Sequence, residues 1–176
     1  MSYNSQQAII AKYTDISRYR PEYIYGNVYV DEKRVKEALK NDIEKEKLKI
    51  EIEIADKFAK NFDCKVFMLP PTENGDVIYK EKNSNPDFIS YNMFLEIKRP
   101  KGTKTSIRTR FQESVHQADG VLISIQNNIP INVAKKWIEE KLQLMNNHDG
   151  FVVVIESMNN YGLFTVKEKG LKKAPF

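Results

Sequence analysis

The sequence predicts an α/β or α+β fold in which helices pack against a sheet. Two observations lead to this class. From residue 31 to 62, apolar side chains recur at the spacing of one helix face. From residue 86 to 99, two short apolar runs flank a polar turn, a pattern typical of paired strands. The chain has 176 residues, of which 41% are hydrophobic and 30% charged, so it is long and apolar enough to bury a core.

The elements follow in order along the chain. Residues 31–62 are expected to form one long helix or two abutting helices, with an apolar face made of Leu48, Ile52, Ala55, Ala59 and Phe62. Residues 64–70 form a strand that ends at Pro70 and Pro71, and a turn follows at 72–76. The remaining predicted elements are strands at 86–91 and 93–99, a helix at 101–118, a strand at 120–125, a helix at 131–145, and strands at 150–157 and 162–168. The helix at 101–118 carries the apolar face Ile107, Phe111, Val115 and Ala118.

Residues 1–40 are predicted to form an N-terminal arm, and residues 41–176 the main domain. Six of the nine tyrosines lie within the first 30 residues, with Arg18 and Arg20 among them. Aromatic rings and arginines together can stack on nucleobases. The simpler interpretation, which we favour, is that the arm packs its rings on the main domain.

Composition excludes several classes of protein. No apolar run is long enough for a membrane span, and the N-terminus lacks the apolar core of a signal peptide. The single cysteine, Cys64, excludes an internal disulfide and suits the cytoplasm, where we expect the protein to act. The net charge of +4 suggests a polyanionic partner.

Three charged side chains stand out on the two strands at 86–99. In an extended strand, Glu96 and Lys98 point to the same face, opposite to their apolar neighbours. Asp87 lies on the preceding strand, so strand pairing is expected to bring its carboxylate next to Glu96.

Clustered carboxylates repel one another, so they need a cation between them. Oxygen ligands suit Mg²⁺ or Mn²⁺, with Zn²⁺ as an alternative. A metal held by Asp87 and Glu96 would polarise a phosphodiester and lower the pKa of a bound water, which Lys98 would position or help to deprotonate. Asp87→Ala is then expected to abolish cleavage and to stabilise the metal-free fold by relieving repulsion. The alternative is an ordinary salt bridge between strands.

Pro-Asp occurs once in the chain, ten residues before the Glu-Ile-Lys of the second strand. Pro86-Asp87 followed by Glu96-Ile97-Lys98 resembles the signature of the PD-(D/E)xK nuclease superfamily. The resemblance implies a restriction-endonuclease-like core, in which a mixed central sheet is flanked by helices. It also implies a Mg²⁺- or Mn²⁺-dependent endonuclease, a hydrolase acting on phosphodiester bonds.

Members of this superfamily often have a further metal-binding glutamate on the first helix. Glu51 and Glu53 are the candidates. At about 100° per residue, Glu51 projects at the edge of the apolar face and Glu53 nearly opposite. A buried carboxylate needs a partner, and a metal would be one. We therefore expect Glu51 to be the third ligand; the alternative is that both are solvated.

A closer resemblance covers roughly residues 42–126. The segments "MLPPT", "NPDF", "LEIKRP" and "SVHQADGVLISI" are similar to the toxin nuclease domains of contact-dependent growth inhibition systems, which cleave DNA or tRNA. This implies that Gln117 supports the site or contacts substrate, and that an immunity protein is a partner. A homodimer, as in other nucleases of the superfamily, is a further expectation. The chain begins at Met1 without a long delivery segment, so a free-standing nuclease of a mobile element stays an alternative.

The segment that follows the second strand is rich in basic residues and lacks acids as far as Gln112. We expect it to contact a nucleic-acid backbone through Arg99, Lys101, Lys104, Arg108 and Arg110. His116 and His148 lie far apart in the sequence and lack the spacing of a zinc site.

Two other functions stay open. One is a catalytically silent nucleic-acid-binding or virion-associated module on the same scaffold. The other is a protein-interaction domain in which the acidic residues form structural ion pairs. Tight, stoichiometric Mg²⁺ or Mn²⁺ binding that depends on Asp87 would distinguish the protein-interaction domain from both nucleic-acid functions.

Overall fold

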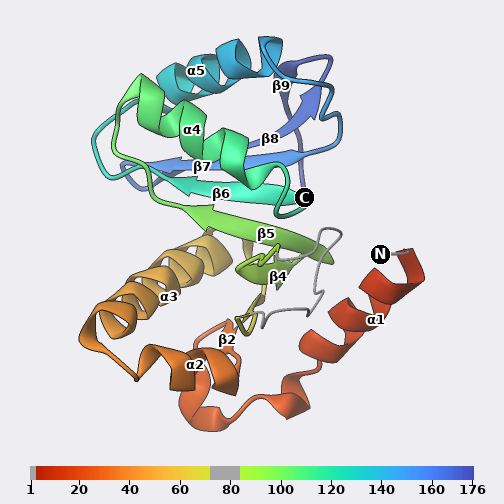
Figure 1. The fold of residues 1–176 in the computed structure, drawn as a ribbon, viewed down its shortest axis with the longest axis vertical. Helices are drawn as coiled ribbons and strands as arrows, with labels where there is room; N and C mark the ends of the chain where they lie inside the picture. Colours follow the sequence, from red (N-terminus) through yellow and green to blue (C-terminus); the bar gives the residue numbers. More distant parts are fainter. Residues whose placement is uncertain (1–2, 72–83) are drawn as a thin grey trace. The chain divides into compact units, whose positions relative to one another are not determined.

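The computed structural model describes residues 3–71 and 84–176, and the turn predicted at 72–76 lies outside these ranges. The chain forms two compact units, residues 1–94 and 95–176. Helices flank sheet strands that pair in both parallel and antiparallel directions, which confirms the predicted α/β class (Figure 1). Within the described residues, no helix combines the length and the apolar character that crossing a membrane requires. A division at residue 40 stays a prediction.

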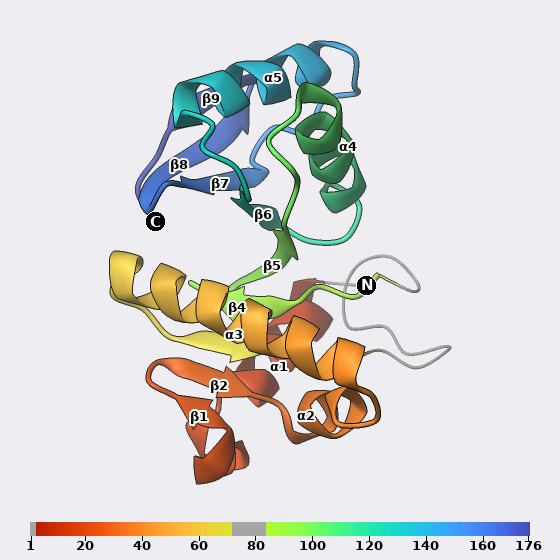
Figure 2. The same cartoon turned by 90° about the vertical axis from the view of Figure 1, so that its left-hand side faces the viewer.

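The first unit combines short strands with helices. Its elements are α1 (Tyr3–Tyr13), two 3-10 turns (Ile16–Arg18 and Pro21–Tyr23), β1 (Ile24–Tyr25), β2 (Val28–Val30), α2 (Glu32–Ala38), α3 (Asp42–Phe62), β3 (Val66–Met68) and β4 (Phe88–Ser90). β2 pairs with β1 in the antiparallel direction and with β3 in the parallel direction, and β4 is antiparallel to β3. α3 lies across β2 and β3 (Figure 2).

The helical segment at 31–62 consists of two helices, since α2 ends before α3 begins. Asn41 caps α3, because its side-chain oxygen accepts a hydrogen bond of 2.8 Å from the backbone N–H of Glu44. Asp63 ends α3 in the left-handed conformation, with φ 48°. The buried face of α3 consists of Leu48, Glu51, Ala55, Phe58 and Ala59. It thus includes one carboxylate among apolar side chains.

Aromatic rings of the N-terminal segment pack within the first unit. The ring of Tyr19 is buried, with its centroid 5.7 Å from that of Tyr29 and 5.8 Å from that of Phe67. Tyr29 and Phe67 stack with centroids 5.1 Å apart. These contacts agree with the simpler interpretation of the tyrosines, in which their rings serve packing.

The second unit places two helices on one side of its strands. Its elements are β5 (Met93–Lys98), which begins in the first unit, α4 (Lys104–Ser114), β6 (Gly120–Ser124), α5 (Ile131–Gln143), β7 (Val152–Ser157), β8 (Asn160–Lys167) and β9 (Gly170–Lys173). β5, β6 and β7 are parallel neighbours, and β8 and β9 continue in the antiparallel direction. α4 and α5 pack against each other and against β6 and β7 (Figure 1). Phe111, Ile123 and Ile138 belong to the core between these layers.

α4 is shorter than the sequence predicts. It starts after Thr103, whose side-chain oxygen accepts a hydrogen bond of 3.2 Å from the backbone N–H of Ser106. It ends at Ser114, whose hydroxyl donates to the carbonyl oxygen of Phe111 at 2.6 Å. The prediction of a helix as far as Ala118 is therefore wrong, although Ala118 is buried beyond the helix end.

The turn between β8 and β9 contains two non-glycine residues in the left-handed conformation. Glu168 and Lys169 have φ values of 52° and 60°, and the register sets Lys167 opposite Gly170. A side chain with a Cβ is disfavoured in such two-residue turns. Lys169→Gly is expected to stabilise the protein by about 0.5–1 kcal/mol. Relief of about 1–2 kcal/mol of backbone strain exceeds the ~0.4–1 kcal/mol that the flexibility of glycine costs in the unfolded chain.

Urea unfolding of the full chain measures this change. Lys172→Gly is the matched control, because Lys172 is an exposed lysine within β9, paired with Thr165. That variant should lose about 0.5–1 kcal/mol, the usual cost of a glycine inside a strand. A loss of stability in both variants would contradict the strain at Lys169.

Candidate functional site

α3 buries one of the two candidate glutamates and exposes the other. The side chain of Glu51 lies on the buried face, with 8% of the residue exposed. Glu53, two residues further along the helix, is exposed to solvent. The prediction that Glu51 rather than Glu53 projects from the apolar side of this helix is confirmed. Its role as a ligand stays a prediction.

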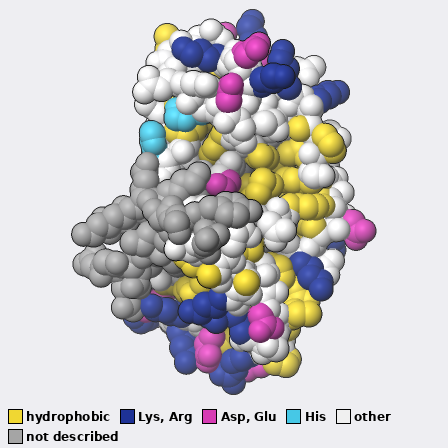
Figure 3. Space-filling view, turned by 90° about the vertical axis from the view of Figure 1, so that its right-hand side faces the viewer, with side chains coloured by type: hydrophobic (Ala, Val, Ile, Leu, Met, Phe, Trp, Pro, Cys, Tyr) yellow, Lys and Arg dark blue, Asp and Glu magenta, His cyan; other side chains and the backbone are white. Residues whose placement is uncertain are grey.

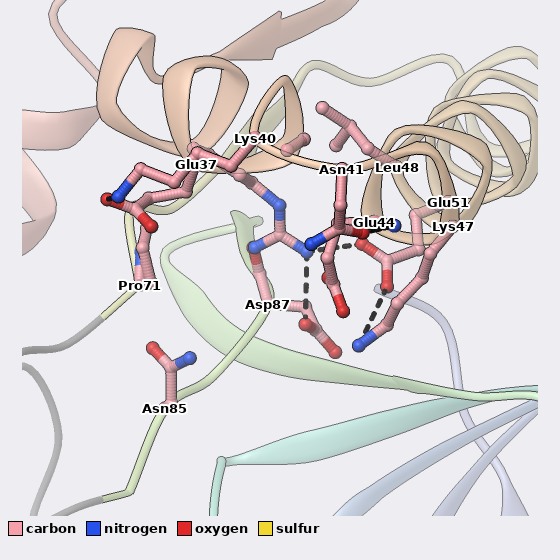
Figure 4. A pocket seen from close by; sticks show the side chains of 12 residues that line it. Glu37, Lys40, Asn41, Glu44, Lys47, Leu48, Glu51, Pro71, Asn85 and Asp87 are labelled. Atoms are coloured by element: carbon pink, nitrogen blue, oxygen red, sulfur yellow. Dashed lines mark hydrogen bonds and ion pairs between the residues drawn. The ribbon is translucent and has the colours of Figure 1, made fainter.

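An arginine from α2 joins Glu51 to Asp87. The Nη2 atom of Arg34 lies 2.5 Å from Oε2 of Glu51 and 3.2 Å from Oδ1 of Asp87. Its Nη1 atom donates hydrogen bonds to the main-chain carbonyl oxygens of Leu69, at 3.0 Å, and of Asp87, at 3.3 Å. Figure 4 shows the two carboxylates converging from α3 and from the segment before β4. One guanidinium therefore serves as the shared counter-ion of two of the predicted ligands.

Burial and charge act against each other in this cluster. Burial raises the pKa of the Glu51 carboxyl above its ordinary value, and the charge of Asp87 acts in the same direction, against the lowering effects of Arg34 and Lys47. Burial acts to lower the pKa of the Arg34 guanidinium, but the charges of Asp87 and Glu51 outweigh it and raise that pKa. Arg34 is therefore cationic at neutral pH.

The sequence predicts repulsion between Asp87 and Glu96, and the ion pair with Arg34 adds a contact that changes the expected effect of removing Asp87. Repulsion between Asp87 and its acidic neighbour Glu51 is already offset by Arg34, at 3.2 Å and 2.5 Å respectively. Asp87→Ala would remove a favourable partner of a buried cation. It is therefore not expected to stabilise the metal-free fold.

A polar pocket of about 320 Å³ opens beside the cluster within the first unit. Besides the ion-paired residues, its described lining includes Lys40, Glu44, Lys47 and Asn85 (Figure 4). The Nζ atom of Lys47 lies 3.9 Å from Oε1 of Glu51. Both oxygens of Glu51 thus face positive groups.

The donor atoms of this cluster fit a divalent ion. Carboxylate oxygens are the ligands that Mg²⁺ and Mn²⁺ prefer, and those of Glu51 and Asp87 already converge on one positive charge. In the ranges 3–71 and 84–176, no group of three or more His, Cys, Asp or Glu side chains is arranged to hold a metal. An ion would have to take the carboxylates from Arg34.

The second unit gathers three other predicted site residues around one lysine. The Nζ atom of Lys98 lies 3.1 Å from Oε1 of Glu96 and donates a hydrogen bond to Oε1 of Gln117 at 3.4 Å. Oε2 of Glu113 is 3.8 Å from the same Nζ. The side chains of Lys98 and Glu96 are 15% and 9% exposed. Strand alternation in β5 brings this pair together, as the sequence predicts.

Two residues in these clusters have positions that the sequence did not predict. Gln117 lies in the turn after α4 rather than on the helix, and its backbone N–H donates to the carbonyl of Ser114 at 3.0 Å.

Arg34 was not predicted as a site residue. A signal existed, because Arg34 lies beside the buried Val35 and four residues before the buried Ala38 on α2. An arginine on the flank of an apolar face needs an acidic partner.

The predicted nucleic-acid-binding residues lie before α4 (Arg99 and Lys101), at its first position (Lys104) and along it (Arg108 and Arg110). Arg99, Lys101, Lys104 and Arg110 are exposed and Arg108 is partly exposed. Lys104 forms an ion pair of 2.6 Å with Glu140 of α5, and Arg110 one of 3.1 Å with Glu113. These acids reduce the positive charge that the segment presents. Contact with nucleic acid stays a prediction.

The two histidines, far apart in the sequence, are neighbours in the second unit. The ring centroids of His116 and His148 lie 5.9 Å apart, and Figure 3 shows histidine side chains, in cyan, at the molecular surface. Burial lowers the pKa of His148 below its ordinary value near 6.5, and the charge of His116 lowers it further. The sequence did not predict this proximity.

His148 is expected to make the stability of the protein depend on pH. Because its folded-state pKa is lowered, its contribution is present above about pH 6.5 and is lost as the pH falls through the folded-state pKa. NMR titration should give a midpoint below 6.5 for His148. His116→Gln should raise this midpoint, because it removes the charge of His116, which is one of the two causes of the lowered pKa of His148. An unchanged midpoint would exclude coupling between the rings.

Comparisons with protein-family models, with curated protein sequences and with solved structures gave no match to this chain. The fold and the site define an α/β protein with a carboxylate–arginine cluster in one unit and a lysine–carboxylate cluster in the other. The resemblance to the PD-(D/E)xK nuclease superfamily is therefore supported by the motif residues of the sequence alone.

Proposed function

We propose that the protein is a metal-dependent nuclease that uses Mg²⁺ or Mn²⁺. Asp87 and Glu96 are the metal ligands, Glu51 is an added ligand, and Lys98 activates the attacking water. One observation supports this proposal most. Residues chosen from the sequence motif have partners within their own unit: Glu51 and Asp87 share one cation, and Lys98 contacts Glu96 and Gln117.

The side chains have separable roles in this proposal. A bound divalent ion would supply Lewis acidity toward the phosphate and a lower pKa for water. Glu96 and Gln117 hold the ammonium group of Lys98 in place, which orients it toward the water. Gln117 touches Lys98 and acts as a positioning residue.

The substrate in this proposal is DNA or tRNA. The exposed basic side chains around the start of α4 support a polyanion, since they come directly after the strand that carries Glu96 and Lys98. A toxin-like or mobile-element role, an immunity protein, a homodimer and action in the cytoplasm are expectations from the resemblance alone.

One gel assay tests the proposal. The purified full chain and its Asp87→Ala variant are incubated with plasmid DNA and with total tRNA, each in Mg²⁺, Mn²⁺ or EDTA. Cleavage that needs both the metal and Asp87 is the expected result, and the substrate that is lost identifies DNA or RNA. Cleavage that persists in EDTA, or in Asp87→Ala, would contradict the assignment.

A second candidate is a catalytically silent nucleic-acid-binding module on the same scaffold. It is favoured by Arg34, which gives Glu51 and Asp87 a shared counter-ion without any metal. In that case the wild type binds nucleic acid in the presence of EDTA but does not cleave it. Cleavage that requires both Mn²⁺ and Asp87 would exclude this candidate.

A further inference from the structure

Arg34 is tied to the site by both of its terminal nitrogens. Nη2 bonds to the two carboxylates, and Nη1 donates to the carbonyl oxygens of Leu69 and Asp87. The side chain is 13% exposed, and those of Glu51 and Asp87 are 11% and 16% exposed. A contact so shielded from water is a built feature of the fold, unlike a surface ion pair.

The guanidinium and a divalent ion would need the same oxygens. Nη2 of Arg34 lies 2.5 Å from Oε2 of Glu51 and 3.2 Å from Oδ1 of Asp87. It therefore occupies the position beside these oxygens that a metal ion would need. A guanidinium keeps its charge, so it cannot give way by losing a proton. Two cations on one pair of buried carboxylates repel each other at short range. Binding of the one therefore requires release of the other.

The charged side chains that line the pocket also support competition between Arg34 and a divalent ion. Its described lining includes four carboxylates, Glu37, Glu44, Glu51 and Asp87, and three cationic side chains, Arg34, Lys40 and Lys47. Without the charge of Arg34, the negative groups exceed the positive ones by two. That excess equals the charge of one divalent ion.

We propose that Arg34 is the exchangeable counter-cation of the Glu51–Asp87 pair, to which it is ion-paired in the absence of metal and which it must release when a divalent ion binds. This inference rests on the proposed function, because it concerns the regulation of the same site. Arg34 sets the metal concentration at which the site fills. It also keeps the two carboxylates converged before the metal arrives.

Calorimetric titration of the full chain with Mn²⁺ tests the exchange. Arg34→Met keeps the length of the side chain and removes its charge, so it is expected to bind Mn²⁺ at least about tenfold more tightly than the wild type. The control is Arg18→Met, which removes an arginine that is ion-paired with Asp31, at 3.1 Å in the same unit. This variant should bind Mn²⁺ like the wild type. Arg34→Met that binds no more tightly than the wild type would overturn the inference.

Melting temperature gives a second readout of the same variants. Arg34→Met leaves two buried carboxylates without their main counter-charge, so its metal-free fold should melt earlier than that of the wild type. Mn²⁺ should raise its melting temperature more than that of the wild type, because a ligand of the folded state stabilises in proportion to its affinity. An equal rise in both proteins counts against the exchange.

A measurement on the wild type keeps the inference testable if Arg34→Met does not fold. In protein labelled with ¹⁵N-arginine, Mg²⁺ should shift the Nε–H signal of Arg34, which is assigned by its loss in Arg34→Lys. Asp87→Ala should abolish the shift. A bound Mg²⁺ that leaves this signal in place would overturn the inference.

These outcomes separate the inference from the proposed function. If the wild type cleaves nucleic acid with Mn²⁺ but Arg34→Met shows unchanged affinity, only the inference fails. If neither protein binds Mn²⁺ and the wild type does not cleave, the proposed function fails and the inference fails with it. If Arg34→Met binds Mn²⁺ more tightly than the wild type but neither protein cleaves nucleic acid, the exchange is supported and the nuclease is not.

Discussion

Lys98→Met is expected to lower the rate of metal-dependent cleavage by about 10²–10⁴-fold without weakening Mn²⁺ binding. In the proposed function Lys98 acts on the water and not on the metal. Its Nζ atom is held by Glu96 at 3.1 Å and by Gln117 at 3.4 Å, so a neutral side chain in its place loses both contacts. Single-turnover cleavage and Mn²⁺ calorimetry measure the two quantities separately.

Asp87→Asn should behave differently, because Asp87 is proposed as a ligand. It is expected to lose both Mn²⁺ affinity and cleavage, the latter by at least about a thousandfold, which corresponds to about 4 kcal/mol in the barrier. Glu53→Gln is the matched control, since Glu53 is an exposed glutamate on α3, away from the buried face that carries Glu51. It should cleave at the wild-type rate. Wild-type cleavage by both Lys98→Met and Asp87→Asn would refute the assignment of the site.

Local geometry was sufficient to predict part of the site. The rotation of about 100° per residue along a helix separates Glu51 from Glu53, and the structure buries only the former. The alternation of a strand likewise brings Glu96 and Lys98 to within 3.1 Å of each other. Both relations involve residues two apart in the sequence, so no tertiary information was needed.

Tertiary contacts decided the rest of the site. Arg34 contacts Asp87, which lies 53 positions further along the sequence. The local sequence of α2 does not identify Asp87 as the partner. The end of α4 at Ser114 depends on a hydroxyl that bonds back to Phe111, which a helical pattern of apolar residues does not reveal. Gln117 consequently lies in a turn. These features belong to packing and capping, which periodicity alone cannot specify.

Short elements at both ends of the chain were also missed. β2 has three residues, and it exists because it pairs in parallel with β3, whose residues lie 38 positions further on. β9 has four residues, of which Lys172 and Lys173 are exposed. A strand this short contains too few residues for alternation to be read. Pairing with a longer neighbour, β8 in the case of β9, defines it.

Phe58→Ala is expected to cost about 3–5 kcal/mol of unfolding free energy, the usual loss for a fully buried phenylalanine. Phe58 lies on α3 and is 0% exposed. Its ring centroid is 4.9 Å from that of Phe62 and 5.6 Å from that of Phe88, the residue after Asp87. It therefore holds α3, which carries Glu51, against β4, which begins directly after Asp87.

Urea unfolding followed by circular dichroism measures this loss, and Ile43→Ala provides the control. Ile43 also lies on α3 but is 80% exposed, so its truncation should change stability by less than about 0.5 kcal/mol. Loss of the Phe58 ring should also weaken Mn²⁺ binding before the protein unfolds, because α3 then no longer fixes the distance between Glu51 and Asp87. A Phe58→Ala variant as stable as Ile43→Ala would mean that contacts other than the Phe58 ring hold α3 in place.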